Sequence, residues 1–263
     1  MAHRQYQHIV LSPHLDDAPL SCGGAIHQWA AAGEPVLVLT LMTGDPPAGP
    51  HSPFAEYQHA TWGVSAREAF AVRRAEETAA LGRLGADLSH LGYRDCIYRG
   101  DGEIFFYTSN EALFGAVHPA DAPLVETLVR DLAALGPLAP EATVYAPLAI
   151  GNHIDHQLLR RAAERWRSRD LQYYEDYPYA QRGDSQTLEA QRLGSQFATR
   201  PARPVQVPLT DEAMQAKIDA IGLYSSQISM LFGNHTQMEA DVRAFARHTA
   251  GESGWSERFW LAH

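Results

Sequence analysis

The chain has 263 residues, 45% of them hydrophobic and 20% charged, which is ordinary for a globular protein with a sizeable core. Its formal net charge of −10 argues against nucleic acid or an anionic membrane as a partner, because both require a basic surface. No apolar run approaches the roughly 20 residues that span a bilayer, and no signal segment is evident. We therefore expect a cytoplasmic protein with a small-molecule substrate, and its two cysteines reduced and buried.

The first predicted element is a short buried strand over residues 8–11, and a dense polar cluster follows it at once. Within four residues the chain places His14, Asp16 and Asp17. The apolar run ends abruptly before them, so the strand presents one imidazole and two carboxylates at its carboxyl end.

Strands and helices then alternate along the chain. The predicted strands lie at residues 35–42, 88–93, 143–148 and 171–179. The predicted helices lie at residues 20–32, 65–84, 119–134 and 154–168. Alternation of this kind predicts an α/β fold with a Rossmann-like, mostly parallel sheet and helices on both faces.

Two segments interrupt this alternation. Residues 46–63 hold four prolines and three aromatic residues, and we expect a loop over the functional site or a plain surface excursion. Residues 97–118 form an insertion with a hairpin turn signal at 99–103 and a strand signal at 104–107. The aromatic residues of the insertion suit either a wall for a sugar or acyl group or structural decoration.

The last third of the chain carries no recognisable motif. Its predicted elements are a loop at 183–194, an edge strand at 205–209, a helix at 210–231 and a final helical segment at 239–260. Because no linker is evident, we expect one domain over residues 1–263, with a core at about 7–180 and a C-terminal extension at about 181–263.

A second polar cluster follows the predicted strand at 143–148 and contains His153, Asp155 and His156. In a doubly wound sheet, ligands bind beyond the carboxyl ends of the strands, where the strand order reverses. Histidine and carboxylate are zinc ligands, and a catalytic zinc keeps three protein ligands and an open position. The two clusters together predict one metal site, whereas the other histidines of the 13 are assigned no role.

Four motifs in order resemble the PIG-L (LmbE-like) family of zinc-dependent N-deacetylases. They are Pro13-His14-Leu15-Asp16-Asp17, Cys22-Gly23-Gly24, the Arg73-x-x-Glu76 segment and His153-Ile154-Asp155-His156. The resemblance covers roughly residues 7–180. Ala18 departs from the pattern, since many members have a glutamate there that is not a metal ligand.

The resemblance implies one Zn²⁺ per chain, held by His14, Asp17 and His156. It also implies that Asp16 is the general base. Zinc lowers the pKa of bound water to about 7, so a neighbouring carboxylate suffices to remove the proton.

By the same resemblance, His153 stabilises the developing oxyanion as an imidazolium that Asp155 keeps charged. Arg73 is expected to contact the polar headgroup of the substrate. The alternative for Arg73 is an exposed ion pair with Glu76 on one helix, worth only a few tenths of a kcal/mol. Glu175 and Asp176, at the end of the strand at 171–179, are expected to line the cleft.

The expected activity is therefore removal of an N-acetyl group from an amino sugar or an N-acetylglucosamine-type conjugate. Two alternatives stay open: a metal-dependent hydrolase of another amide or a phosphoester, and a non-catalytic ligand-binding protein on the same fold. Phosphoesterases usually use two metals and hence more ligands. The sequence also leaves open whether the chain forms a homo-oligomer and which group protonates the leaving amine.

Overall fold

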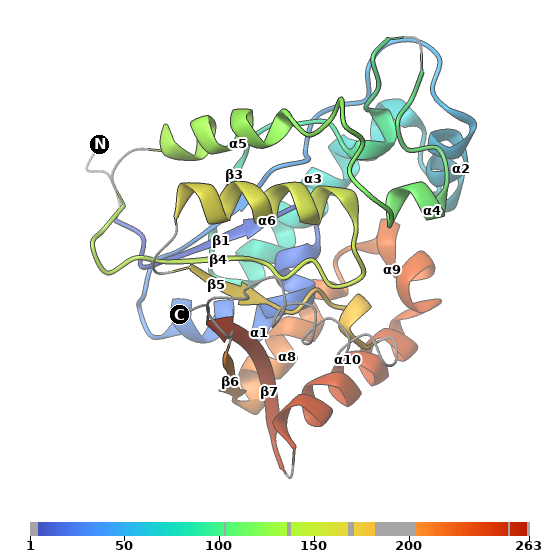
Figure 1. Ribbon diagram of the computed structural model, residues 1–263. Coiled ribbons are helices and arrows are strands. Elements are labelled where there is room, and N and C mark those ends of the chain that lie inside the picture. The colour runs from blue at the N-terminus through green and yellow to red at the C-terminus, as the bar shows by residue number, and fades with distance from the viewer. Residues whose placement is uncertain are drawn as a thin grey trace.

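Within residues 5–102, 104–135, 138–167, 171–181, 203–251 and 253–261, which the computed structural model describes, seven strands form one sheet (Figure 1). The strands are β1 (His8–Ser12), β2 (Val36–Thr40), β3 (Asp87–His90), β4 (Thr143–Pro147), β5 (Leu171–Tyr174), β6 (Arg203–Leu209) and β7 (Trp255–Leu261). Their order across the sheet is β3-β2-β1-β4-β5-β7-β6.

The five strands from β3 to β5 run parallel, and β7 pairs antiparallel with both β5 and β6. The strand order reverses at β1, where Ile9 pairs with Leu37 of β2 on one side and with Val144 of β4 on the other. This is the position at which doubly wound folds bind ligands. The predicted Rossmann-like fold class is confirmed.

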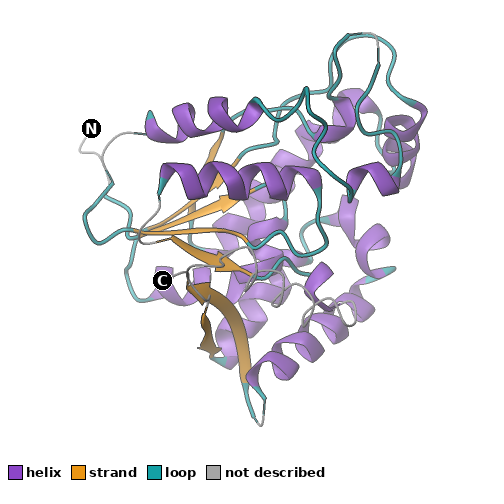
Figure 2. Ribbon diagram, in the orientation of Figure 1, coloured by secondary structure: helices purple, strands orange, loops and turns teal. Residues whose placement is uncertain are grey.

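Helices cover both faces of the sheet (Figure 2). One face carries α1 (Asp17–Ala31), α3 (Ala66–Leu84) and α8 (Asp211–Ile221), and the other carries α5 (Leu124–Ala133) and α6 (Ile154–Trp166). The remaining helices of the described residues are α2 (Pro53–Trp62), α4 (Asn110–Leu113), α9 (Ser225–Phe232) and α10 (His235–Ala250), with single 3-10 turns η1 (Cys96–Tyr98) and η2 (Tyr179–Gln181). None of the described helices is long and apolar enough to cross a membrane.

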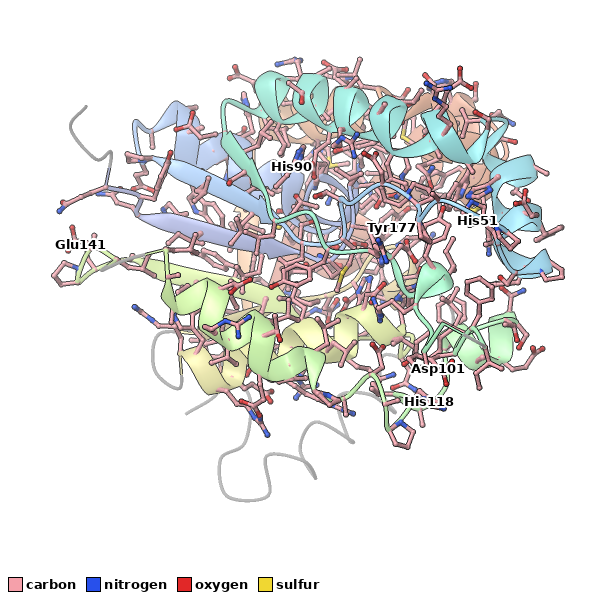
Figure 3. All side chains as sticks on the ribbon, turned by 90° about the horizontal axis from the view of Figure 1, so that it is seen from above. His51, His90, Asp101, His118, Glu141 and Tyr177 are labelled. Atoms are coloured by element: carbon pink, nitrogen blue, oxygen red, sulfur yellow. The ribbon has the colours of Figure 1, made fainter. Side chains whose placement is uncertain are left out.

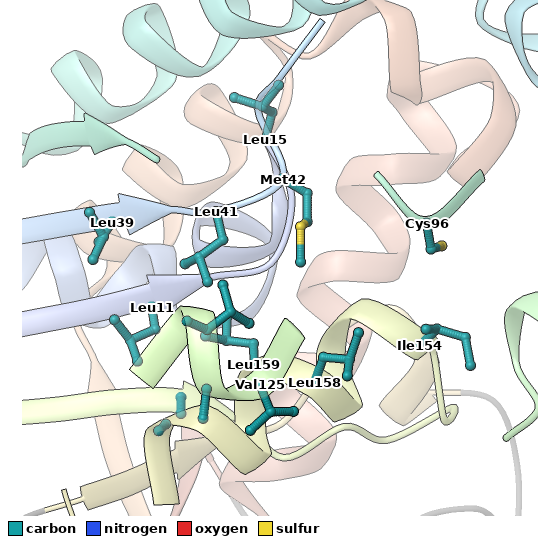
Figure 4. Close-up of a cluster of buried hydrophobic side chains, with 14 of the residues drawn as sticks. Leu11, Leu15, Leu39, Leu41, Met42, Cys96, Val125, Ile154, Leu158 and Leu159 are labelled. Atoms are coloured by element: carbon teal, nitrogen blue, oxygen red, sulfur yellow. The ribbon is translucent and has the colours of Figure 1, made fainter. Parts of the chain in front are cut away.

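The central strands are buried from both sides. Ile9 and Leu11 of β1 belong to the cluster beneath α5 and α6, where Leu11 lies near Leu159 (Figure 4). Val10, between them, belongs to the cluster formed with α1, α3 and α8. Burial on both faces explains why β1 and β2 read as continuous apolar runs. Both cysteines are free and buried, as predicted.

The expected loop at 46–63 is wrong for its second half, which is helix α2. The Ser52 side chain accepts a hydrogen bond from the Ala55 amide and caps the helix. Pro53 occupies the first turn, where its missing N–H costs nothing, and Gly63 ends the helix at φ 68°. The number of prolines obscured the cap that directs Pro53 into a helix.

The insertion at 97–118 also differs from the expected hairpin. Gly100 and Phe105 form a single antiparallel bridge, and no strand follows over residues 104–107. The loop predicted at 183–194 lies outside the described residues.

In the C-terminal third, β6 lies at the sheet edge as predicted. The helix expected at 210–231 is divided into α8 and α9. The last segment is helical only to Ala250 and then becomes β7, because Gly251 and Gly254 have positive φ values of 84° and 82° that stop the helix.

Candidate active site

The two polar clusters meet where β1 and β4 end. In Figure 1 the arrowhead of β1 points towards the region surrounded by α2, α4 and α9. The ring centroids of His14 and His153 lie 4.7 Å apart, and those of His14 and His156 lie 5.4 Å apart. All three rings are buried. The topology therefore brings together residues separated by about half of the chain.

Asp17, in the first turn of α1, contacts both histidines of the expected ligand set. Its Oδ2 lies 3.1 Å from His14 Nδ1 and 3.4 Å from His156 Nε2. The His14 backbone amide also donates to this oxygen at 2.8 Å, which fixes the carboxylate. Asp17 Oδ2 thus lies close to one ring nitrogen of each histidine.

The two histidines are oriented in the same way from behind. His156 Nδ1 lies 2.6 Å from Asp176 Oδ1, and its Nε2 is buried with no hydrogen-bond partner among the described residues. His14 Nε2 lies 3.0 Å from Asp155 Oδ2, and the other ring nitrogen of His14, Nδ1, faces Asp17. A carboxylate on the far nitrogen is the usual support of a metal-ligating histidine. The residues present therefore fit a metal ion, and one carboxylate with two imidazoles suits zinc.

Three groups of described residues near this point have ligand atoms within 4.8 Å of one another, and none of them contains Asp17. They are the three histidines, then Cys96, His153 and Asp155, and lastly His14, Asp95 and Asp155. In the two groups that contain Asp155, however, this carboxylate is already engaged: Arg99 Nη1 lies 2.6 Å from its Oδ1, and the Cys96 amide donates to its Oδ2 at 3.0 Å. The unpaired Nε2 of His156 favours the site formed with Asp17.

The charge balance keeps Asp17 ionised. Burial alone would raise its pKa, but the charge of His156 and the hydrogen bond and charge of His14 outweigh burial and hold the pKa well below its usual value. Burial correspondingly opposes protonation of His156, yet Asp17 and Asp176 raise its pKa to about 9. Asp17 and His156 therefore attract each other strongly. A cation bound at this point would take over the attraction to Asp17.

Asp16 is the residue before α1 and faces the cavity that adjoins the site. Burial raises the pKa of Asp16 to about 6, against the opposing charge of Arg73, whose Nη2 lies 3.6 Å from Oδ1. A carboxylate with this pKa is ionised at neutral pH and can still accept a proton readily.

Arg73 is buried on α3 and does not form the exposed ion pair considered from the sequence, so that alternative is wrong. Glu76 instead accepts hydrogen bonds from the amide and hydroxyl of Ser226. The Arg73 guanidinium lies over the Trp62 ring, 5.1 Å from its centroid, and lines the cavity beside Asp16.

His153 and Asp155 are related differently from the expectation. The Asp155 backbone amide donates to His153 Nδ1 at 3.2 Å, so His153 caps the N-terminus of α6. The Asp155 carboxylate contacts His14 and Arg99. Burial, followed by the charges of His14 and His156, lowers the pKa of His153 well below its usual value. The charge of Asp155 still favours the protonated imidazole, but burial and the charges of His14 and His156 outweigh it.

Sequence reasoning missed two supports of the site. Arg99, part of the predicted hairpin turn, is a buried guanidinium that pairs with Asp121 at 2.9 Å as well as with Asp155. Asp176, expected in the cleft with Glu175, instead holds His156, and Glu175 accepts from Trp260 Nε1 at 3.0 Å. The position of Asp176 at the end of a predicted strand indicated that it lies near the site. No sequence pattern indicated a role for Arg99.

A cavity opens over Asp16, and its volume of about 310 Å³ is at the low end of the range for ligand pockets. Helix α2 contributes four residues to its wall, so the segment at 46–63 does lie at the site. From the insertion at 97–118, Phe114 lines the cavity, whereas the aromatic residues at 105–107 do not. Two other histidines, labelled in Figure 3, lie far apart and do not line the cavity. His90 Nε2 lies within hydrogen-bond distance of Glu77, and the His118 ring stacks on Phe106.

Comparison with known proteins agrees with this geometry. The family model of PIG-L, described as GlcNAc-PI de-N-acetylase, matches residues 9–166. The 2'-N-acetylparomamine deacetylase of Streptomyces fradiae is 29% identical over 265 residues, which cover 95% of this chain and 84% of that protein.

Two solved structures are similar over almost the whole chain. The zinc-inhibited form of teicoplanin deacetylase Orf2 has a TM-score of 0.80 and 27% identity, covering 97% of this chain and 98% of its own. The A40926 pseudoaglycone deacetylase Dbv21 has a TM-score of 0.73 and 31% identity, covering 99% and 98%. With a family model matched over more than half of its length and a relative above 30% identity, this chain belongs to the PIG-L family of de-N-acetylases.

Proposed function

We propose that this chain is a zinc-dependent hydrolase that removes the N-acetyl group from an amino sugar conjugate. The observation that carries the proposal is His156 Nε2, which has no hydrogen-bond partner in the part of the chain that the structure describes and lies 3.4 Å from Asp17, beside the base-like carboxylate of Asp16. The deacetylase relatives support the same reaction class, and the named substrates of those relatives are acetylated sugar compounds.

His14 Nδ1, an oxygen of Asp17 and His156 Nε2 are the atoms that would hold one zinc ion. When bound, zinc lowers the pKa of water to about 7 and polarises the scissile carbonyl. The three side chains are held from behind by Asp155, Asp176 and the His14 amide, so little reorganisation is needed to receive a cation.

Asp16 acts as the general base and accepts the proton of the attacking water. The nearby guanidinium of Arg73 limits how far burial can raise the Asp16 pKa, and therefore keeps the carboxylate ionised at neutral pH. Once protonated, Asp16 is placed to return the proton to the leaving amine. Arg73 also offers its remaining N–H groups to polar atoms of the substrate in the cavity.

His153 stabilises the oxyanion as a neutral donor. Its Nδ1 accepts the Asp155 amide hydrogen, so the proton of the neutral ring resides on Nε2. That N–H can donate to the carbonyl oxygen as negative charge develops, while the cap on α6 fixes the ring in place. Asp155 is a positioning residue, since its carboxylate orients His14 and its amide orients His153.

We also propose that the chain is one domain. In support, β6 and β7 from the C-terminal extension extend the same sheet as the N-terminal strands.

Acetate release from N-acetylglucosamine glycosides tests the function. Protein stripped with a chelator should lose turnover, and one equivalent of zinc should restore it. The Asp16→Asn variant, loaded with zinc in the same way, should bind the glycoside without releasing acetate. Binding by both proteins without acetate from either would indicate the non-catalytic alternative.

A further inference from the structure

The cavity has two chemically different zones. Its floor, formed by the site residues, holds every carboxylate, guanidinium and imidazole side chain of the described lining: His14, Asp16, Asp17, Arg73, Asp95 and His153. Its rim is formed by Tyr57 of α2, Phe114 after α4, Tyr179 of η2, and Met230 and Leu231 of α9.

The rim exposes apolar side chains to an unusual degree. Tyr57 and Met230 are 62% and 39% exposed, and they are two of only five large hydrophobic side chains exposed among the described residues. The helices that carry them, α2 and α9, pack against each other beside the site (Figure 1). Exposed apolar side chains gathered at a cavity mouth favour contact with an apolar ligand group.

An aromatic path connects the rim to the floor. The Tyr179 and Phe114 rings lie 5.6 Å apart in an edge-on arrangement, and Phe114 lies 5.5 Å from the His153 ring in the same manner. A group attached to the sugar on the floor would therefore leave the site along a surface of aromatic edges. Ring-to-ring contact of this kind stabilises an aromatic ligand more than a flexible polar one.

The outer lining is also free of charge, although the chain has a net charge of −10. Besides the rim residues, the polar side chains of the described lining outside the floor are Gln58, Thr61, Asn110 and Gln227. A polycationic or polyanionic conjugate would leave its charges without complementary partners there, which reduces selectivity for it.

We infer that the natural substrate carries its N-acetyl amino sugar on an uncharged, aromatic aglycone that packs against the rim. The inference rests on the proposed function and narrows its substrate class. Met230 suits this role because its unbranched side chain adapts to the shape of a ligand and contacts aromatic rings favourably.

Matched glycosides test the inference. Phenyl and methyl N-acetyl-β-glucosaminides offer the same acetamide and differ only in the aglycone, and an N-acetylated aminoglycoside provides the polycationic case. For the zinc-loaded protein we expect kcat/KM to be about tenfold or more higher for the phenyl glycoside than for the methyl one, mainly through KM. The aminoglycoside should be the poorest of the three.

Variants at the rim sharpen the test. Tyr57→Ser combined with Met230→Ser should reduce the phenyl-to-methyl ratio towards one. Leu223→Ser is the matched control, since Leu223 is 40% exposed and does not line the cavity, and it should keep the ratio. A wild-type ratio near one, a ratio insensitive to the rim variants, or preference for the aminoglycoside would each overturn the inference.

Calorimetric titration with the two glycosides separates this inference from the proposed function. If zinc-loaded protein released acetate from no glycoside, the proposed function would be refuted. The ratio of the two dissociation constants would then decide the inference, with tighter binding of the phenyl glycoside supporting it and equal binding overturning it.

Discussion

Two of the groups of buried charged side chains in the described part of the chain differ in how completely their polar atoms are paired. At the carboxyl ends of β1 and β4, His156 Nε2 has no hydrogen-bond partner among the described residues, and Asp16 has a pKa raised by burial. Between α1, α8 and β7, Lys217 lies 2.6 Å from Glu257, whose carboxylate also accepts the amides of Gly24 and Ala25.

The second group is structural. Helix α1 departs from helical geometry at Cys22, where φ is −136°, and Glu257 accepts the amides that this break leaves free. The charge of Glu257 is compensated by Lys217, and neither residue lines the cavity over Asp16. Buried charge alone therefore does not mark a functional site. A buried ligand atom without a hydrogen-bond partner beside a cavity does indicate such a site, because no interaction within the protein offsets the cost of removing that atom from water.

The largest effect on turnover should follow from Asp16→Asn. The substitution preserves shape but removes the proton acceptor, so kcat should fall about 10²- to 10⁴-fold while metal content is kept. Steady-state acetate release, with metal analysis of the same sample, measures both.

The pH profile identifies the cause of this loss. Because burial raises the pKa of Asp16 to about 6, wild-type kcat/KM should fall as pH drops through that value and the carboxylate becomes protonated. The residual activity of the variant should lack this step. A wild-type profile that is flat from pH 7 to below pH 5 would remove Asp16 from the role of base.

His153→Ser should have the next largest effect. Serine can still cap α6 but has no donor that reaches the cavity, so kcat should fall about 10²- to 10³-fold with little change in KM. Kinetics should be accompanied by thermal unfolding, which should shift little. A normal kcat would show that the oxyanion is stabilised elsewhere.

Asp176→Asn should act through the metal. Loss of the carboxylate behind His156 Nδ1 is expected to weaken zinc affinity about 10- to 100-fold. Excess zinc should restore most of the turnover, whereas it should not rescue Asp16→Asn. Competition with a chromogenic chelator measures the affinity, and an unchanged value would contradict the orienting role of Asp176.

Glu257→Gln should affect the site least and the fold most. Removing one charge from the buried pair is expected to lower the free energy of unfolding by about 3 to 5 kcal/mol. Metal content and kcat/KM, measured well below the unfolding temperature, should stay near wild type. Loss of zinc in a folded Glu257→Gln protein would mean that the two buried groups are coupled.

The sequence allowed the fold class and the convergence of the two clusters to be predicted, because apolar runs and strand order determine which ends are neighbours. The supports of the site were harder to see. Arg99 reaches Asp155 through tertiary packing, although it lies beside a glycine in an apparent turn. Helix α2 was obscured by the prolines that precede it, although its cap at Ser52 is a local signal. The final strand β7 was obscured by its similarity to an amphipathic helix. For Arg99 and β7, contacts distant in sequence outweighed the local pattern.

Metal content by mass spectrometry tests the central claim most directly, because it requires no knowledge of the substrate. Untagged wild-type protein and the Glu257→Gln control should each contain about one zinc ion per chain, and Asp17→Ala should contain far less. Wild-type protein without bound metal after zinc is offered, or an Asp17→Ala protein that retains a full equivalent, would contradict a site formed by His14, Asp17 and His156.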